Sequence, residues 1–329
     1  MAKNHSDIVH EQDSTCKYLD DFSASGKRRP WQAHKQASRR LAELYELANQ
    51  LAPLPVLSPK RLVDLYDCGE TLEFALFADG HKELRYAWFC RVRLCPMCMW
   101  RRSLKLAGKM KRAVDSVKTA NPSVRFLFVT FTQKNCSGSA LGETLSAMTS
   151  SFSKVLKRDK RLSKSVLGYM RSIEVTVNTQ DWTCHPHIHA IIAVRADYFT
   201  RNYVKQSEWR EMWQSAMQLD YLPQVNVKLL KGSDWSVAEA AKYAVKSVDV
   251  LADAKDKLSA ARMLADLTVG MKKRRLVSFG GVFRNVKFDD EDNDSGDLVH
   301  VEGSSGDSEI GRVVYRWSPL VGAYVEKER

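Results

Sequence analysis

Two neighbouring segments with a two-residue alternation, 166–178 and 185–195, constrain most strongly what this chain of 329 residues can fold into. Side chains two residues apart on a strand share one face of a sheet. In the second segment His187 and His189 therefore project to one face, and the aliphatic side chains between and after them project to the other. The pattern predicts an antiparallel hairpin with one aliphatic face and one polar face.

The polar face of this predicted hairpin carries a candidate metal site. If the loop 178–184 closes symmetrically, Glu174 lies opposite His189 on the same face as His187. Cross-strand partners stand about 5 Å apart at Cβ, so that two imidazoles and a carboxylate can share one ion. This ligand set suits Mn²⁺, or Mg²⁺ when a phosphate completes the shell. His185 has the same parity and is either a fourth ligand or an outer-sphere group.

The remaining elements alternate between helices and strands. Together with the hairpin they predict an α+β fold, in which helices flank a central antiparallel sheet and a small cysteine-rich module is appended. The expected helices cover 41–51, 96–118, 140–156, 207–219, 236–250 and a segment ending near 270, and the expected further strands cover 71–77, 82–89, 124–132 and 224–230.

Composition divides the chain into four parts. Residues 289–309 contain nine acidic residues and no Lys or Arg, which is typical of a linker or tail. The predicted organisation is listed from the N-terminus: an extension with one helix (1–60), a cysteine-rich module (61–118), a catalytic domain (119–288), and an acidic linker with a C-terminal tail (289–329).

Three of the seven cysteines lie between positions 90 and 98, which is typical of a metal site rather than of disulfides. Cys95 and Cys98 have the two-residue gap of a zinc knuckle, Cys90 precedes them, and Cys68 lies across the predicted 71–89 hairpin. Four thiolates from these positions form a closed Zn²⁺ site. The alternative is a group of buried, reduced cysteines.

Tyr243 does not fit the apolar stripe of its predicted helix, 236–250. It shares the opposite face with Glu239 and Lys246, a carboxylate and an ammonium that can assist a tyrosine nucleophile. The alternative is structural, because Ser236 and Glu239 also match a capping box.

Charge narrows the class of partner. The formal net charge of +12 favours a polyanion, nucleic acid first and an acidic membrane surface second. No run of about 18 apolar residues occurs, which argues against a membrane span, and no apolar secretory signal opens the chain. We therefore expect a cytoplasmic protein that handles nucleic acid.

Several sequence blocks, taken in order, resemble the HUH endonucleases. More narrowly, the chain resembles the single-tyrosine rolling-circle replication initiators of small staphylococcal plasmids, over about residues 65–285. The blocks are CRVRLCPMC (90–98), FVTFT (128–132), EVTVN (174–178), HPHIH (185–189), EAAKYAVK (239–246) and FGGVF (279–283).

The resemblance implies a metal-dependent, site- and strand-specific nickase and strand transferase. Tyr243 would attack the double-strand origin, form a 5′-phosphotyrosine and free a 3′-OH primer. His187 and His189 would bind the metal, and Glu239 would activate water or take part directly at termination. The implied partners are plasmid origin DNA, single-stranded or extruded at the nick, with a host helicase and DNA polymerase.

Two other readings remain at this stage. One is a transposase or relaxase with the same chemistry, although such transposases are about half this length and relaxases generally carry a third histidine and an N-terminal tyrosine. The other is a non-catalytic, zinc-dependent DNA-binding regulator, for which the histidine pair and Tyr243 would be coincidental.

Overall fold

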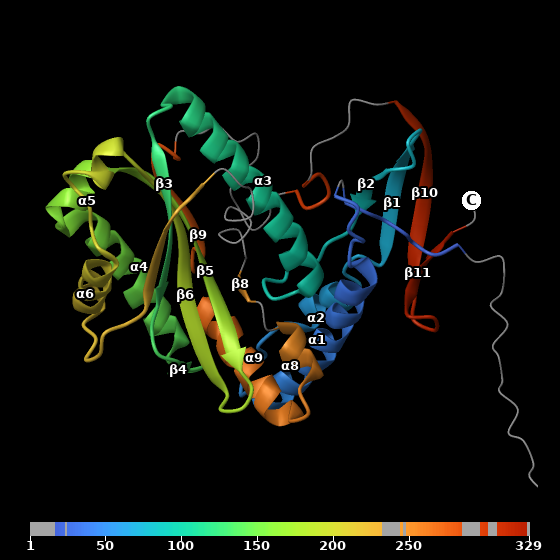
Figure 1. Ribbon diagram of the computed structural model, residues 1–329. Helices are drawn as coiled ribbons and strands as arrows, with labels where there is room; N and C mark the ends of the chain where they lie inside the picture. The colour runs from blue at the N-terminus through green and yellow to red at the C-terminus, as the bar shows by residue number, and fades with distance from the viewer. Residues whose placement is uncertain are drawn as a thin grey trace, which may run out of the picture.

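Two sheets, each mainly antiparallel, organise the protein in the computed structural model (Figure 1). The structure describes residues 17–23, 25–231, 244–245, 248–284, 297–301 and 308–327. Over these residues the α+β prediction is confirmed.

The larger sheet contains the predicted hairpin. Its strand order is β7-β3-β6-β5-β8, with β4 also pairing with β6 and β9 with β5. The strands are β3 (Arg125–Thr132), β4 (Cys136–Ser137), β5 (Val166–Asn178), β6 (Thr183–Val194), β7 (Val225–Leu229), β8 (Ala244–Val245) and β9 (Val277–Gly281). The β5–β6 hairpin lies at the centre of this sheet. One of its faces packs in the main core, and the other carries the predicted metal ligands.

Helices cover one face of the larger sheet completely and the other in part. Aliphatic side chains of β3, β5 and β6, including Val129 and Ile188, join a core with the helices of the first face. These helices are α4 (Leu141–Arg158), α5 (Lys160–Ser165), α6 (Gln206–Met217) and α9 (Lys257–Met271), and a short 3₁₀ turn, Ala196–Phe199, lies between β6 and α6. On the second face, Met110 and Ala113 of α3 (Pro96–Ala120) pack with Phe126 and Ile191 in a separate core.

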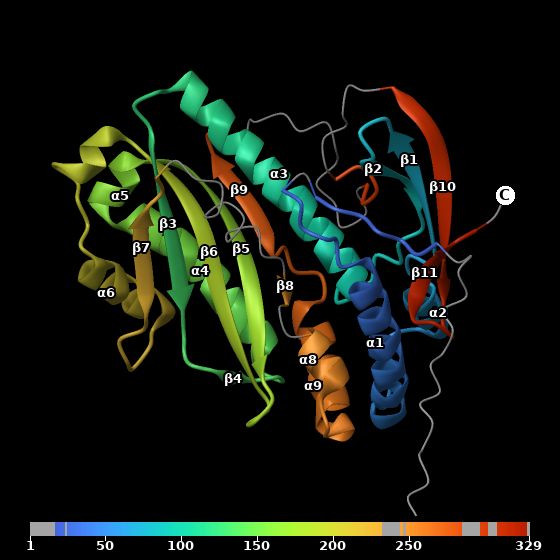
Figure 2. The ribbon, with the colours of Figure 1, turned by 45° about the vertical axis from the view of Figure 1, so that its right-hand side comes forward.

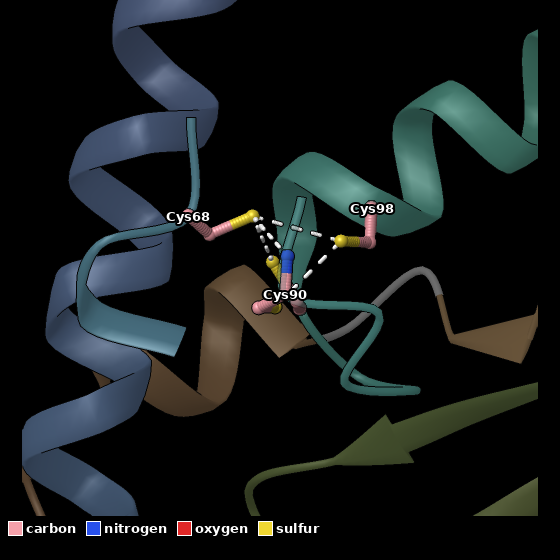
Figure 3. A group of neighbouring side chains, drawn as sticks. Cys68, Cys90 and Cys98 are labelled. Atoms are coloured by element: carbon pink, nitrogen blue, oxygen red, sulfur yellow. Dashed lines mark hydrogen bonds between the residues drawn. The ribbon is translucent and has the colours of Figure 1, made fainter. Parts of the chain in front are cut away.

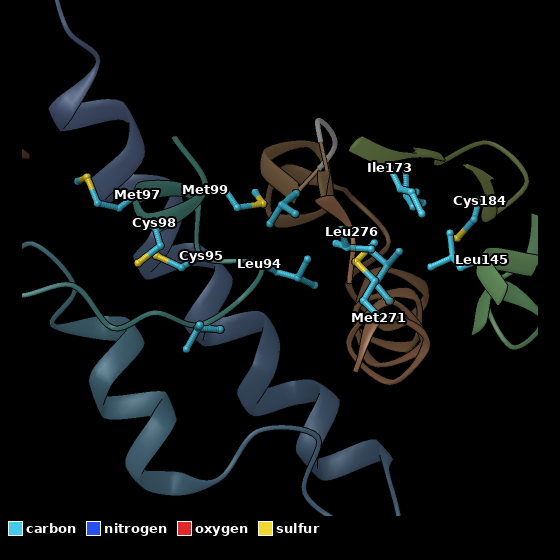
Figure 4. Close-up of a cluster of buried hydrophobic side chains, with 14 of the residues drawn as sticks. Leu94, Cys95, Met97, Cys98, Met99, Leu145, Ile173, Cys184, Met271 and Leu276 are labelled. Carbon is cyan, nitrogen blue, oxygen red and sulfur yellow. The ribbon is translucent and has the colours of Figure 1, made fainter. Parts of the chain in front are cut away.

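The smaller sheet has the order β11-β10-β1-β2. It is built from β1 (Thr71–Phe77), β2 (Lys82–Ala87), β10 (Glu309–Ser318) and β11 (Ala323–Glu326), and it lies beside α1 (Trp31–Leu51) and α2 (Pro59–Tyr66). Helix α3 runs between the two sheets (Figure 2). One hydrophobic core extends from the smaller sheet to the larger one. In it Leu94, Met271 and Leu276 lie between the cysteines and Ile173 of β5 (Figure 4).

The expected C-terminal tail is wrong for residues 309–326. These residues alternate apolar and polar side chains and form β10 and β11, with β10 pairing along the whole of β1. Leu298 and Val301, from within the acidic stretch, are buried. The acidic composition of residues 289–309 predicts a solvated linker, and so it indicates neither the strands that follow nor the burial of Leu298 and Val301.

The expected helix over 236–250 is wrong at Ala244 and Val245, whereas residues 248–250 are helical. Ala244 and Val245 form β8, which pairs in parallel with β5, and a new helix, α8 (Val248–Asp253), begins after them. Pairing with the main-chain edge of β5 overrides the helical propensity of these two residues, one of which, Ala244, is a strong helix former. The other predicted helices and strands are present, with ends shifted by a few residues, and α1 begins ten residues earlier than expected.

No helix within the described ranges is long and apolar enough to cross a membrane.

Gly281 is where β9 meets β5 most closely, and we expect Gly281→Ala to destabilise the fold by at least about 2 kcal/mol. Its φ is +59°, and a Cβ atom there would lie 2.1 Å from the carbonyl oxygen of Leu167. Denaturant unfolding measures the effect. Gly26→Ala is the control, because Gly26 has a φ of +75° but nothing within 4 Å of an added Cβ. Equal losses in the two variants would mean that the close approach to β5 contributes nothing.

Candidate functional site

The pairing of β5 with β6 fixes the candidate metal site. Glu174 pairs with His187, and Ser172 pairs with His189. The predicted register, with Glu174 opposite His189, is therefore wrong by two residues. The turn after Asn178 is tighter than the symmetric loop assumed, because Asn178 already pairs with Thr183 and Trp182 adopts a φ of +53°. A shift of two residues preserves the faces, so the predicted grouping of side chains survives.

Glu174, His187 and His189 form one cluster. The Nε2 atoms of His187 and His189 each lie 3.0 Å from the same carboxylate oxygen, Oε2 of Glu174. One ligand atom from each residue lies within 4.8 Å of the other two, so the cluster could hold a metal ion. The side chains are almost closed to solvent, with His187 the most open at 13%.

The outer contact of His187 favours a cation between its ring and Glu174. His187 Nδ1 lies 3.2 Å from the carbonyl oxygen of His185, an acceptor, so Nδ1 carries the proton. In a neutral imidazole the other nitrogen is then a lone-pair acceptor, and it faces a carboxylate oxygen, which is also an acceptor. Two facing acceptors need a proton or a metal ion between them. The orienting contact on Nδ1 is also the usual arrangement around a metal-binding histidine.

Strand β3 supplies two residues to this site, Phe128 and Thr130, which belong to the block FVTFT (128–132) but were not among the predicted site residues. Thr130 Oγ1 lies 3.3 Å from Nδ1 of His189, and the ring of Phe128 stacks on the His189 ring at 5.8 Å between centroids. Both residues alternate with the core residue Val129. The alternation of β3 could have assigned them to the polar face, but its pairing beside β6 could not be inferred from the pattern.

Glu174 is an anion in this environment. Burial alone would raise the pKa of its carboxyl, but hydrogen bonds with His187 and His189 outweigh that effect and hold the pKa far below its usual range. A ligand that is already deprotonated releases no proton when it binds a metal, so the site is prepared for a divalent ion at neutral pH.

His185 lies next to the cluster without belonging to the three-residue group. Its Nδ1 contacts Oδ1 of Asn135 at 3.0 Å, and its ring centroid is 5.5 Å from that of His187. Burial, and then the charge of His187, lower the pKa of its imidazole. These contacts place His185 beside the three-residue cluster and outside its set of ligand atoms.

The predicted catalytic residues Tyr243, Glu239 and Lys246 lie outside the described residues. The residue after Tyr243 in the sequence is described: Ala244 of β8 pairs in parallel with Glu174 of β5. The main chain that follows the tyrosine is therefore a direct neighbour of the acidic member of the metal cluster.

A second cluster contains the four predicted cysteines, Cys68, Cys90, Cys95 and Cys98. Figure 3 labels three of them, Cys68, Cys90 and Cys98. All four are buried, and their sulfur atoms lie within 4.8 Å of one another. Separations of 3.6 Å join Cys68 to Cys98 and Cys68 to Cys95, and 3.7 Å joins Cys90 to Cys98. This group could also hold a metal ion.

Main-chain donors surround the sulfurs of this cluster. The N–H groups of Cys90 and Arg91 donate to Cys68 Sγ at 3.4 Å and to Cys98 Sγ at 3.3 Å, with Arg91 at a φ of +57°. Without an ion, burial raises the pKa of the Cys68 thiol well above its ordinary value. A cation reverses this effect, since it stabilises the thiolate directly.

The comparisons with known proteins agree on one family. A family model described as "Replication protein" matches residues 81–325. The chain is similar to "Protein rep" of Streptococcus pneumoniae, 33% identical over 323 residues, covering 95% of this chain and 97% of the relative. It is 39% identical to "Protein rep" of Lactiplantibacillus plantarum, covering 86% and 89%, and 34% identical to "Replication protein" of Staphylococcus aureus, covering 65% and 96%. No solved structure matches.

The family match extends beyond the sequence blocks that carry the resemblance, which end near residue 285. The family model reaches residue 325, so residues after 288 belong to the family pattern, contrary to the expectation from the blocks alone.

The geometry predicts that His189→Ala abolishes most Mn²⁺ binding, whereas His185→Ala leaves it nearly intact. His189 Nε2 belongs to the three-residue cluster, and His185 is its neighbour outside it. We expect the Mn²⁺ affinity of His189→Ala, measured by isothermal titration calorimetry, to fall by at least roughly 100-fold, more than is typical for an outer-sphere residue. Equal losses in both variants would contradict this assignment. The thiol cluster is a poor competitor because Mn²⁺ prefers oxygen and nitrogen ligands.

Proposed function

The chain belongs to the Rep_1 family of replication proteins of rolling-circle plasmids, and we propose that it initiates plasmid replication by nicking one strand of the double-strand origin. The observation that carries this proposal is the shared contact of two histidines with Glu174, on the strand that pairs with the residue after Tyr243. In this proposal the protein is a DNA endonuclease and strand transferase acting in the cytoplasm on origin DNA that is single-stranded or extruded at the nick site.

Glu174, His187 and His189 hold the catalytic divalent ion, Mn²⁺ or Mg²⁺, in this proposal. The ion withdraws charge from the scissile phosphate and fixes its orientation. The three side chains contribute a largely buried group of ligand atoms in which the carboxylate is already ionised. Phe128 and Thr130 contact the His189 ring and so help to orient this ligand.

Tyr243 is the proposed nucleophile. Its phenolic oxygen attacks the phosphorus, an Oη–P bond forms, and the bond from phosphorus to the 3′ oxygen breaks. The 5′ end stays on the tyrosine, and the 3′-OH becomes the primer for a host polymerase, behind a host helicase. Lys246 neutralises developing charge. Support comes from β8, whose pairing brings Ala244 beside Glu174.

Glu239 has a second role in the proposal. After one round of synthesis the displaced strand is released, and Glu239 activates the water that hydrolyses the phosphodiester. Hydrolysis replaces a second covalent transfer, which explains how one tyrosine is sufficient.

The four cysteines hold a structural Zn²⁺ in the proposal. Tetrahedral Zn–S bonds of about 2.3 Å place the sulfurs roughly 3.8 Å apart. The separations of 3.6 and 3.7 Å fit this spacing. Four protein ligands leave no open position, so this ion would stabilise the fold and take no part in the nick.

Tyr243→Phe is expected to abolish both nicking and the covalent product. Purified protein is mixed with supercoiled plasmid carrying its origin and Mn²⁺, and open circles with protein on the 5′ end are detected after protease-free electrophoresis. Tyr203→Phe is the control, since Tyr203 is exposed on a segment between β6 and α6. Adduct formation by Tyr243→Phe at the normal level would rule out the proposed nucleophile.

Glu239→Gln is expected to leave the first nick nearly unchanged and to impair termination. The amide cannot take a proton from water, so unit-length circles decline and longer products accumulate by at least about 10-fold. Gel analysis of replication products in a cell extract measures the ratio. If termination is normal and the first nick is lost, Glu239 instead serves Tyr243 or the fold.

A further inference from the structure

Lys35 of α1 is fully buried, and its ammonium is committed to one loop. Nζ donates to the carbonyl oxygens of Tyr66 at 2.9 Å and Cys68 at 3.1 Å, and it forms an ion pair with Glu70 Oε2 at 2.9 Å. An ammonium has three N–H donors, so these three acceptors satisfy it completely. All three lie within residues 66–70, with Cys68 at the centre.

Ser38 lies one turn further along α1 and reaches the other half of the cysteine cluster. Its Oγ is 3.4 Å from Cys95 Sγ, and it accepts a hydrogen bond from the N–H of Met97 at 3.4 Å. The single hydroxyl proton of Ser38 goes either to the carbonyl oxygen of His34, at 2.8 Å, or to Cys95 Sγ when that sulfur is a thiolate. One helix therefore contacts both the loop that presents Cys68 and the start of α3, which presents Cys95 and Cys98.

Lys35 is a charged residue at a place where packing alone needs no charge. A buried ammonium is unfavourable unless its surroundings are anionic. Glu70 supplies one anion, and four thiolates around Zn²⁺, with a net charge of −2, would make the surroundings more anionic still. A neutral long side chain could fill the same space between α1 and the loop without any charge to bury.

We propose that α1 is an integral part of the cysteine metal site, with Lys35 as the positioning residue that holds Cys68 in ligand geometry and Ser38 as the neighbour that supports Cys95. The match to the family model begins at residue 81, so both residues lie outside it. The inference rests on the structural Zn²⁺ proposed above. It assigns the N-terminal helix a role in metal retention.

The test is zinc retention by the full-length protein. Zinc-loaded wild type and Lys35→Met are incubated with a colorimetric chelator, and both the release rate and the affinity in chelator competition are measured. Methionine keeps the length of the side chain and removes the three N–H donors. We expect the zinc affinity of Lys35→Met to fall roughly 10- to 100-fold, the usual effect of an outer-sphere residue. In the Co²⁺-substituted protein, the charge-transfer bands of sulfur ligands should weaken in parallel.

Ser151→Ala is the matched control. It removes a buried hydrogen bond, from Oγ to the carbonyl of Ala216 at 2.8 Å, in the α4–α6 region. It should lower unfolding stability without changing zinc affinity. Zinc affinity of folded Lys35→Met equal to that of wild type would overturn the inference.

If Lys35→Met does not fold, Ser38→Ala decides the question, since it removes only one hydroxyl. Faster zinc release supports the inference, and unchanged release overturns it. If the wild type binds no zinc at all, the proposed Zn²⁺ site fails and this inference fails with it. If the wild type retains zinc and only the α1 variants lose it, both the proposed Zn²⁺ site and this inference are supported.

Discussion

The carboxylate of Glu174, buried between two imidazoles, is the interaction on which the arrangement of the large sheet depends. A buried anion is strongly unfavourable unless it is paired, and Glu174 is 4% exposed. Its partners stand on the adjacent strand, so β5 and β6 must pair in a register that brings position 174 near 187 and 189. The opposite face of the same strands is aliphatic and joins the main core. The apolar core and the Glu174 cluster therefore require the same orientation of the hairpin. The core determines which face of the two strands is buried against the helices, and the cluster determines the register in which they pair.

This agreement explains how much of the site could be predicted from sequence. Parity is a local property, so the grouping of Glu174, His187 and His189 followed from alternation even though the register was wrong by two residues. Register depends on the turn, and the left-handed backbone of Trp182 leaves no clear signal in the sequence. The pairing of Ala244 with Glu174 depends on a free edge of β5 formed by distant segments, which no helix periodicity can reveal. The segments that form β10 and β11 have the alternation of strands, but the acidic residues before them favour a linker or tail.

The two clusters are held at a fixed separation by one helix. Cys95 precedes the first turn of α3, and Cys98 lies within it, so any ion bound by the cysteines would fix where this helix begins. Further along, Met110 and Ala113 pack against the large sheet, in the same core as Ile191 of β6. Helix α1 adds a second connection, since it contacts the cysteines through Lys35 and Ser38 and packs against α9 through the bond of Tyr45 to Thr268 at 2.8 Å. The cysteine cluster is therefore connected to the hairpin through packed helices.

Helix α3 shows why a basic run in the sequence is not sufficient to identify a DNA-binding surface. A run of Lys and Arg along a helix is typical of a DNA-binding surface, but in α3 Arg101, Arg102 and Lys109 are buried. Arg101 donates to the carbonyls of Leu298 and Val299, at 2.9 and 2.6 Å, and so anchors part of the acidic stretch on the helix. A guanidinium that is already committed to internal acceptors releases no counterions when DNA approaches, and it adds nothing to the salt dependence of binding. The net charge of +12 therefore overstates what α3 can offer to a phosphate backbone, because several of its cations are buried while others, such as Lys111 and Arg112, are exposed.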